Sequence, residues 1–84
     1  MGETGEIVLY GADWCGDCRR AKAWLRENEV PFTEVDVEHD DVARDKAVEI
    51  AGGRKNIPVI VLPGGGVLIE PTNSQLAEAV AALG

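Results

Sequence analysis

The sequence predicts a small α/β domain whose elements follow the order β-α-β-α-β-β-α. Two continuous apolar runs, at 7–10 and 59–62, are typical of buried strands. Two segments between them, 15–28 and 41–51, carry apolar residues at helical spacing. A proline- and glycine-rich turn then leads into a further apolar run at 67–69, a pattern that indicates a β-hairpin. We therefore expect one domain over residues 1–84, with a four-stranded mixed sheet and helices on both faces.

The first half of the chain predicts a strand, a helix and a second strand. The strand at 7–10 is followed by a turn at 11–13 and by the helix at 15–28, with Pro31 as a stop signal. Residues 32–37 alternate between apolar and polar, which indicates a half-buried strand at a sheet edge. Because a helix joins these two strands, they should be parallel. The residues before 6 are expected to form a frayed tail.

The second half predicts a helix, a hairpin and a last helix. The charged turn at 38–41 suits the N-terminus of the helix at 41–51, and two glycines follow its end. The hairpin strands should be antiparallel. Residues 71–74 offer capping side chains for the last helix, whose apolar face is Leu76, Ala79, Val80 and Leu83. The corresponding face of the helix at 41–51 is Ala43, Ala47, Ile50 and Ala51.

The two cysteines of the chain lie in the motif Trp14-Cys15-Gly16-Asp17-Cys18, between the first strand and the first helix. A Cys-x-x-Cys pair in this context indicates a thiol-disulfide redox site. At the start of a helix, unpaired N–H groups and the positive end of the dipole favour the thiolate form of Cys15. We expect Cys15 to be exposed and to attack, and Cys18 to be sheltered and to resolve. Asp17 opposes this, because a carboxylate disfavours a nearby thiolate.

Helical spacing separates two rows of side chains after the motif. One row is cationic and begins at the attacking thiol: Cys15, Arg19, Lys22 and Arg26. The other row is apolar and should face the core: Trp14, Cys18, Ala21 and Leu25. The two thiols are thus expected to differ in both charge environment and burial.

Three alternatives to a redox site are less favoured by the sequence. A structural zinc site needs four ligands, usually from two cysteine pairs, and the single histidine, His39, lies in a charged run. An inert disulfide across so short a loop would stabilise the chain little. The acidic cluster at 38–41 is better explained as a solvated helix cap than as a metal site. We expect no bound metal.

Charge and hydropathy exclude several classes of function. The net charge of −7 argues against general nucleic-acid binding. No apolar stretch approaches the length of a membrane span, and residues 1–6 are too acidic and polar for a secretory signal. We expect a cytoplasmic monomer with no tightly bound cofactor. In a reducing cytoplasm a disulfide is usually transient and catalytic.

The Trp-Cys-Gly-Asp-Cys motif, the pair Ile57-Pro58 and the order of elements resemble a glutaredoxin-like member of the thioredoxin superfamily, and most of all the mycoredoxins. The resemblance implies a thioredoxin-like fold, with Cys15 as nucleophile and Cys18 as resolving thiol. It also implies a cis proline facing the active site, at Pro58. Electrons would come from a low-molecular-weight thiol or from a flavin-dependent reductase.

Three departures from the family pattern concern glutathione. Glutaredoxins usually carry a lysine where this chain has Ala12, and a tyrosine where it has Asp17. The segment that grips the amino group of glutathione is replaced by residues 70–74. We therefore expect mycothiol to be preferred over glutathione, with a cationic contact from Arg19, Arg54 or Lys55. The predicted substrate- and thiol-binding residues are Trp14, Gly16, Asp17, Arg19, Ile57, Pro58, Thr72, Asn73 and Ser74.

The function expected is that of a thiol-disulfide oxidoreductase that reduces disulfides in proteins or mixed disulfides. One alternative is a thioredoxin-like electron donor to a reductase such as ribonucleotide reductase. A second is a non-catalytic binding module with the same fold, which the redox spacing of the two cysteines disfavours.

Overall fold

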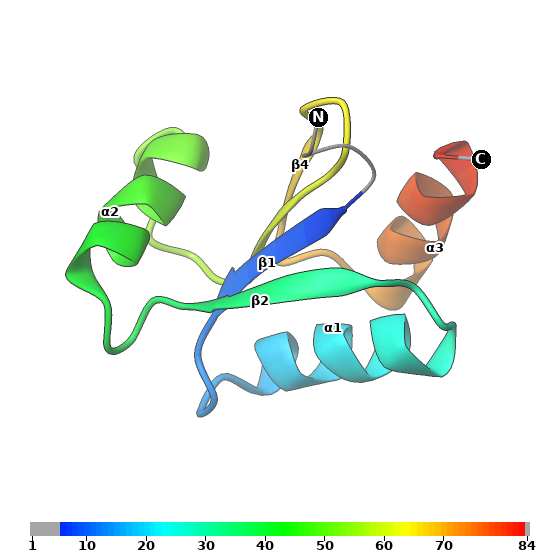
Figure 1. Cartoon of the computed structure of the whole chain (residues 1–84), viewed down its shortest axis with the longest axis horizontal. Helices are drawn as coiled ribbons and strands as arrows, with labels where there is room; N and C mark the ends of the chain where they lie inside the picture. Colours follow the sequence, from blue (N-terminus) through cyan, green and yellow to red (C-terminus); the bar gives the residue numbers. More distant parts are fainter. Residues whose placement is uncertain (1–5, 84) are drawn as a thin grey trace.

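The computed structural model describes residues 6–83 and confirms the predicted order of elements. The expected tail at 1–5 lies outside the described residues. The elements are β1 (Ile7–Gly11), α1 (Gly16–Glu27), β2 (Phe32–Asp36), α2 (Asp41–Ile50), β3 (Val59–Val61), β4 (Val67–Ile69) and α3 (Asn73–Ala82), as Figure 1 shows. No helix within 6–83 is long and apolar enough to cross a membrane.

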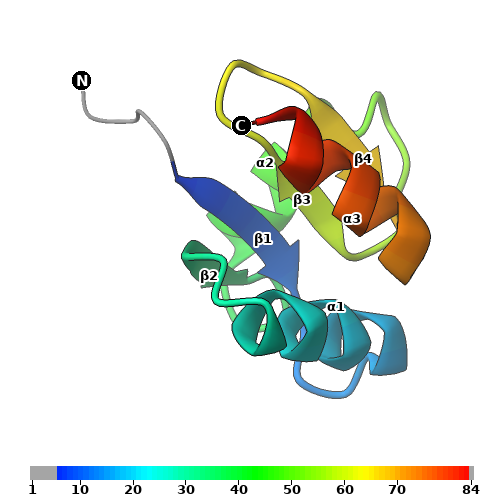
Figure 2. The same cartoon turned by 90° about the vertical axis from the view of Figure 1, so that its right-hand side faces the viewer.

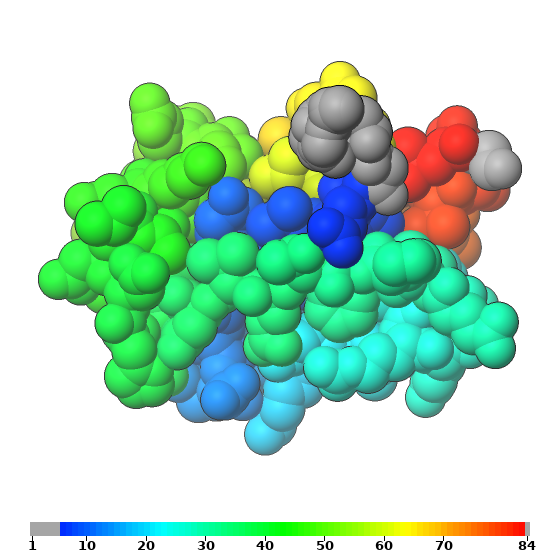
Figure 3. Space-filling model, in the orientation of Figure 1, coloured from blue at the N-terminus to red at the C-terminus, as the bar shows by residue number. Residues whose placement is uncertain are grey.

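The four strands form one mixed sheet in the order β2-β1-β3-β4. β1 and β2 are parallel, with Ile7 opposite Phe32, whereas β3 is antiparallel to both β1 and β4. The parallel first pair and the antiparallel hairpin confirm the prediction. β2 lies at an edge, and its side chains form part of the surface that faces the viewer in Figure 3.

Helices cover both faces of the sheet, as expected: α1 and α3 lie on one face and α2 on the other (Figure 2). Side chains alternate between the two faces along each strand. Leu9 of β1 and Ile60 of β3 thus pack against Leu25 of α1 and Leu76 of α3. The neighbouring strand residues Tyr10 and Val59 pack instead against the alanine face of α2.

The prediction for Leu83 is wrong. It was placed on the buried face of the last helix, but it is 43% exposed. Leu83 is the C-cap of α3, one residue beyond the helical positions, so the helical spacing that buries Leu76 no longer directs it towards the sheet.

Side chains and turns at the helix ends satisfy backbone groups that the helices leave unpaired. Asp40 accepts the N–H of Ala43 at the start of α2, and Thr72 and Gln75 form a reciprocal capping box at the start of α3. α1 and α2 both end in a Schellman motif, in which the residue directly after the C-cap lies in the left-handed region. That residue is Gly52 (φ 73°) after α2 but Glu29 (φ 57°) after α1.

The two helix ends predict opposite responses to substitution. Glu29→Gly should raise the free energy of unfolding by up to about 1 kcal/mol, because glycine adopts the left-handed conformation without the strain of a Cβ atom. Gly52→Ala should lower it by about 1 kcal/mol for the same reason, since the space around Gly52 is open and only the backbone conformation opposes alanine. Urea denaturation measures both changes, and equal effects of the two substitutions would contradict this account.

Candidate active site

Cys15 lies at the N-cap of α1, immediately after the turn that follows β1. Its backbone is extended (φ −81°, ψ 118°), and its sulfur accepts a hydrogen bond from the N–H of Cys18 at 3.3 Å. Cys15 thus takes the position where serine, threonine or aspartate normally caps a helix. An amide donor and the positive helix terminus together favour a negative sulfur. The predicted position of Cys15 at the helix start is confirmed.

Cys15 is more buried than predicted, with 8% of its surface exposed. It packs against Ala12, Cys18 and Ile57, and its thiol lies 3.9 Å from the carbonyl oxygen of Ile57. The Ile57–Pro58 peptide bond is cis, as expected, and Pro58 is buried. The segment before β3 covers the cysteine, a contact between residues 42 positions apart in the chain that helical spacing alone does not reveal.

Cys18 is fully buried, which agrees with its predicted sheltered position. Burial, together with its side-chain contact to Cys15, raises the pKa of the Cys18 thiol to about 12. The backbone of Ala12 and the charge of Lys22 oppose this rise in pKa. Cys18 is therefore a neutral thiol at physiological pH, whereas Cys15 has a built-in donor for its thiolate form.

Gly11, at the end of β1, makes room for the Cys18 sulfur. A Cβ atom at position 11 would lie 2.7 Å from Cys18 Sγ and 3.2 Å from its Cβ. The sequence predicts Gly11 as part of a turn, and this role was not predicted. The signal available was a glycine at the end of a buried strand, which often marks a close approach.

The prediction for Trp14 is partly wrong. Trp14 was expected on the apolar row with Cys18, but 64% of its surface is exposed. α1 begins only at Gly16, so helical spacing does not extend back to Trp14, which lies in the preceding turn. Gly16 and Asp17 are exposed in the first turn of α1, and Asp17 lies 3.5 Å from Arg20.

The cationic row predicted along α1 does not form a free positive surface, because carboxylates pair with two of its members. Lys22 is 6% exposed, and its ammonium lies 2.6 Å from Glu34 of β2 and 3.7 Å from Asp13. Arg26 lies 3.9 Å from the same Glu34 carboxylate. β2 runs alongside α1 and brings Glu34 to this face, which the sequence of α1 alone cannot show. Arg19 is exposed, as expected.

A groove of about 700 Å³ is lined in part by Ala12 and Ile57, which pack against Cys15, while Cys15 itself is outside its lining. Ala12, Trp14 and Ile57, which surround or precede the cysteine, form one wall, and α2 forms the other. The loop before Pro58 places Arg54 and Lys55 in the lining. Carboxylates also line the groove, from Glu38, Asp45 and Glu49. Two of the three predicted cationic candidates therefore lie at the groove, and Arg19 is outside its lining.

The predicted thiol-binding segment at 72–74 begins α3, where Thr72 is the N-cap. Arg20 ties this segment to α1 by donating to Asn73 Oδ1 at 2.7 Å and to the Pro71 carbonyl at 2.9 Å. Ser74 is exposed. The sequence analysis missed Arg20, because its partners lie more than 50 positions away. Residues 72–74 are outside the lining of the groove.

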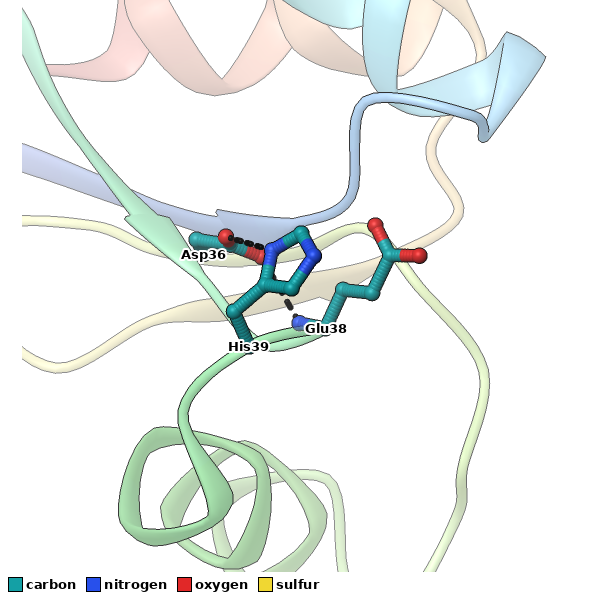
Figure 4. Close-up of side chains that lie close together, drawn as sticks. All are labelled: Asp36, Glu38 and His39. Carbon is teal, nitrogen blue, oxygen red and sulfur yellow. Dashed lines mark hydrogen bonds and ion pairs between the residues drawn. The ribbon is translucent and has the colours of Figure 1, made fainter.

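Asp36, Glu38 and His39 form a cluster at the turn between β2 and α2 (Figure 4). Their potential ligand atoms lie within 4.8 Å of one another, and all three residues are exposed. Asp36 uses one oxygen to accept from His39 and the other to accept the Glu38 N–H. The hydrogen bond with His39 lowers the pKa of Asp36, and the same bond raises the pKa of His39. These hydrogen bonds explain why the three side chains lie together in the turn before α2.

Gly11→Ala should damage the site while leaving the sequence motif intact. The added methyl would displace the Cys18 sulfur, and overpacking of this kind costs about 1–3 kcal/mol of stability. Gly16→Ala is the matched control for the thermal unfolding, since a Cβ atom there meets nothing within 4 Å. Thermal unfolding and the rate of disulfide reduction together test this. A stable, fully active Gly11→Ala protein would contradict the close packing.

The Glutaredoxin family model matches residues 7–68. A Mycobacterium tuberculosis protein provisionally named a glutaredoxin is 30% identical over 73 residues, covering 87% of each chain. A thioredoxin-like protein of known structure is 26% identical with a TM-score of 0.76, over 86% of this chain and 96% of its own. A glutaredoxin from Archaeoglobus fulgidus shares the fold with a TM-score of 0.79 at 21% identity, over 94% of this chain and 88% of its own. The cysteine pair, the cis proline and these similarities together lead to one conclusion: the chain belongs to the glutaredoxin family and is a thiol-disulfide oxidoreductase with a thioredoxin-like fold.

Proposed function

We propose that this protein reduces disulfides in proteins, or mixed disulfides between a protein and a small thiol, in a reducing cytoplasm. The observation that carries the proposal is the hydrogen bond from the Cys18 N–H to the Cys15 sulfur at the start of α1. It stabilises the thiolate, which is the form of cysteine that attacks a disulfide. The low exposure of Cys15 limits the directions from which a disulfide can approach its sulfur.

The reaction begins when the Cys15 thiolate attacks one sulfur of the substrate disulfide. A mixed disulfide forms between Cys15 and that sulfur, and the other substrate sulfur leaves as a thiolate. Two routes complete the cycle. In the dithiol route, Cys18 attacks the Cys15 sulfur, and in the monothiol route a small thiol attacks the mixed disulfide instead.

A protein substrate would lie along the loop before β3. The Ile57 carbonyl lies 3.9 Å from the Cys15 thiol, so a substrate segment that pairs with the backbone there would bring its disulfide to the sulfur. Trp14 would cover the other side of that segment, since it is exposed and lines the groove beside Cys15.

For the reductant, we propose mycothiol in preference to glutathione. Ala12 is buried beside Cys15 and offers no charge to a carboxylate, and Asp17 places a negative charge in the first turn of α1. The groove presents both Arg54 and Lys55 and several carboxylates. Such a mixed lining suits a hydroxyl-rich thiol, whose hydroxyl groups both donate and accept hydrogen bonds, better than an anionic peptide. A flavin-dependent reductase is the second candidate source of electrons.

Substitution of each cysteine should separate the two routes. Cys15→Ser should abolish reduction of every disulfide substrate, because the attacking sulfur is lost. Cys18→Ser should abolish the dithiol reaction with insulin but spare a mixed disulfide if the monothiol route operates. Alkylation of the reduced protein at neutral pH should modify Cys15 well before Cys18, because the high pKa of Cys18 keeps its thiol neutral. Faster alkylation of Cys18 would reverse the assigned roles.

A comparison of reductants tests the second part of the proposal. Turnover of one mixed-disulfide substrate should be faster with mycothiol than with glutathione, each recycled by its own reductase, and a thioredoxin reductase is the third arm. Lys55→Gln should raise the KM for the small thiol severalfold, whereas Lys46→Gln, an exposed lysine of α2 outside the groove lining, should not. Efficient turnover with glutathione alone would overturn the preference.

A further inference from the structure

Lys22 is the one buried charged side chain among the residues that the structure describes. Burying an ammonium group is unfavourable unless opposite charges compensate it. Here Glu34 compensates it at 2.6 Å and Asp13 at 3.7 Å, so that β2, α1 and the loop before Cys15 all meet at the lysine. This ion cluster has no part in the reaction steps described so far.

Lys22 follows Cys18 by four positions in α1, so the two side chains share one face of the helix. Both are buried, and their surroundings therefore screen charge less than water does. Burial and the contact with Cys15 oppose ionisation of the Cys18 thiol, whereas the charge of Lys22 favours it. Among charged side chains, Lys22 is the one whose charge promotes the thiolate that the dithiol route requires.

We propose that Lys22 is a positioning residue for the resolving step, in which its ammonium, held by Glu34 and Asp13, stabilises the negative charge that develops on Cys18. The inference deepens the proposed function and rests on its dithiol route. The Cys18 thiol gives up its proton, which the leaving sulfur ultimately takes up, and the Cys18 sulfur attacks Cys15 in the mixed disulfide. The Cys15–Cys18 bond forms, the bond from Cys15 to the substrate breaks, and the substrate sulfur leaves with the electron pair and takes up a proton.

Glu34 and Asp13 act on Cys18 through Lys22, because they fix where the ammonium lies. Glu34 reaches the lysine from β2, and Arg26 lies 3.9 Å from the same carboxylate. The other ionisable group that acts on the Cys18 thiol is Cys15, which becomes neutral once it is in a mixed disulfide. During resolution, Lys22 is thus the charged side chain acting on the Cys18 thiol that keeps its charge.

An aromatic disulfide, dithiobis-nitrobenzoate, tests this inference, because each reaction step releases one coloured nitrothiobenzoate. Attack by Cys15 gives the first release, and attack by Cys18 on the mixed disulfide gives the second. In stopped-flow mixing at neutral pH, Lys22→Met should slow the second phase severalfold, because removal of the charge raises the pKa of the Cys18 thiol further. The first phase should change by less than about twofold. When the rate of the second phase is plotted against pH, its midpoint should lie at a higher pH in this variant than in the parent protein.

Three variants separate an effect of charge from a loss of structure. Lys22→Arg should restore much of the second-phase rate, because it keeps the positive charge. Glu34→Gln removes the partner but keeps the lysine, so it should slow the second phase less than Lys22→Met does. Lys46→Met, an exposed lysine of α2, should leave both phases unchanged. Circular dichroism of each variant checks that the fold is retained.

The outcomes are distinguishable. A second phase that is insensitive to Lys22→Met, or an equal slowing of both phases, would overturn the role of Lys22 and leave the oxidoreductase function intact. Absence of a second release in the parent protein would overturn both the dithiol route and the role of Lys22. Absence of the first release would contradict the proposed function itself.

Discussion

The hydrogen bond between the Cys18 N–H and the Cys15 sulfur is the interaction on which the site depends. It forms only if Cys15 has extended backbone angles and α1 begins at the next residue. β1 and the turn after it impose that geometry, and the helix supplies a donor that would otherwise be unpaired. The same hydrogen bond therefore caps the helix and supplies a donor to the sulfur of the proposed nucleophile.

The same turn of helix gives two thiols opposite properties. Cys15 lies at the N-terminus of α1, where its sulfur accepts a hydrogen bond from the Cys18 N–H. Cys18 faces Gly11 of β1, where burial keeps its proton in place. A difference of this kind would order the proposed reaction, with Cys15 attacking first and Cys18 resolving the mixed disulfide. Lys22 lies where it can lower the barrier to that second step.

Most of the groove near the cysteines is formed by parts of the chain other than the cysteine motif. The groove beside Cys15 is formed by α2 and by the loop before Pro58, which lie on the face of the sheet opposite α1 and α3. Both positive and negative side chains line this groove. The segment at 72–74 belongs instead to the α1 side, where Arg20 holds it.

The sequence by itself determined the order of the elements, the parallel first pair of strands, the hairpin, the helix caps and the position of Cys15 at a helix start. These features follow from periodicity, capping residues and turns, which are encoded within a few neighbouring residues. The tertiary structure alone decided the burial of Cys15 beneath Ile57, the exposure of Trp14, the burial of Lys22 against Glu34 and the tie between Arg20 and Asn73. Each of these joins residues from different elements or depends on where a helix begins in three dimensions, so the spacing of residues along one helix or strand cannot specify it.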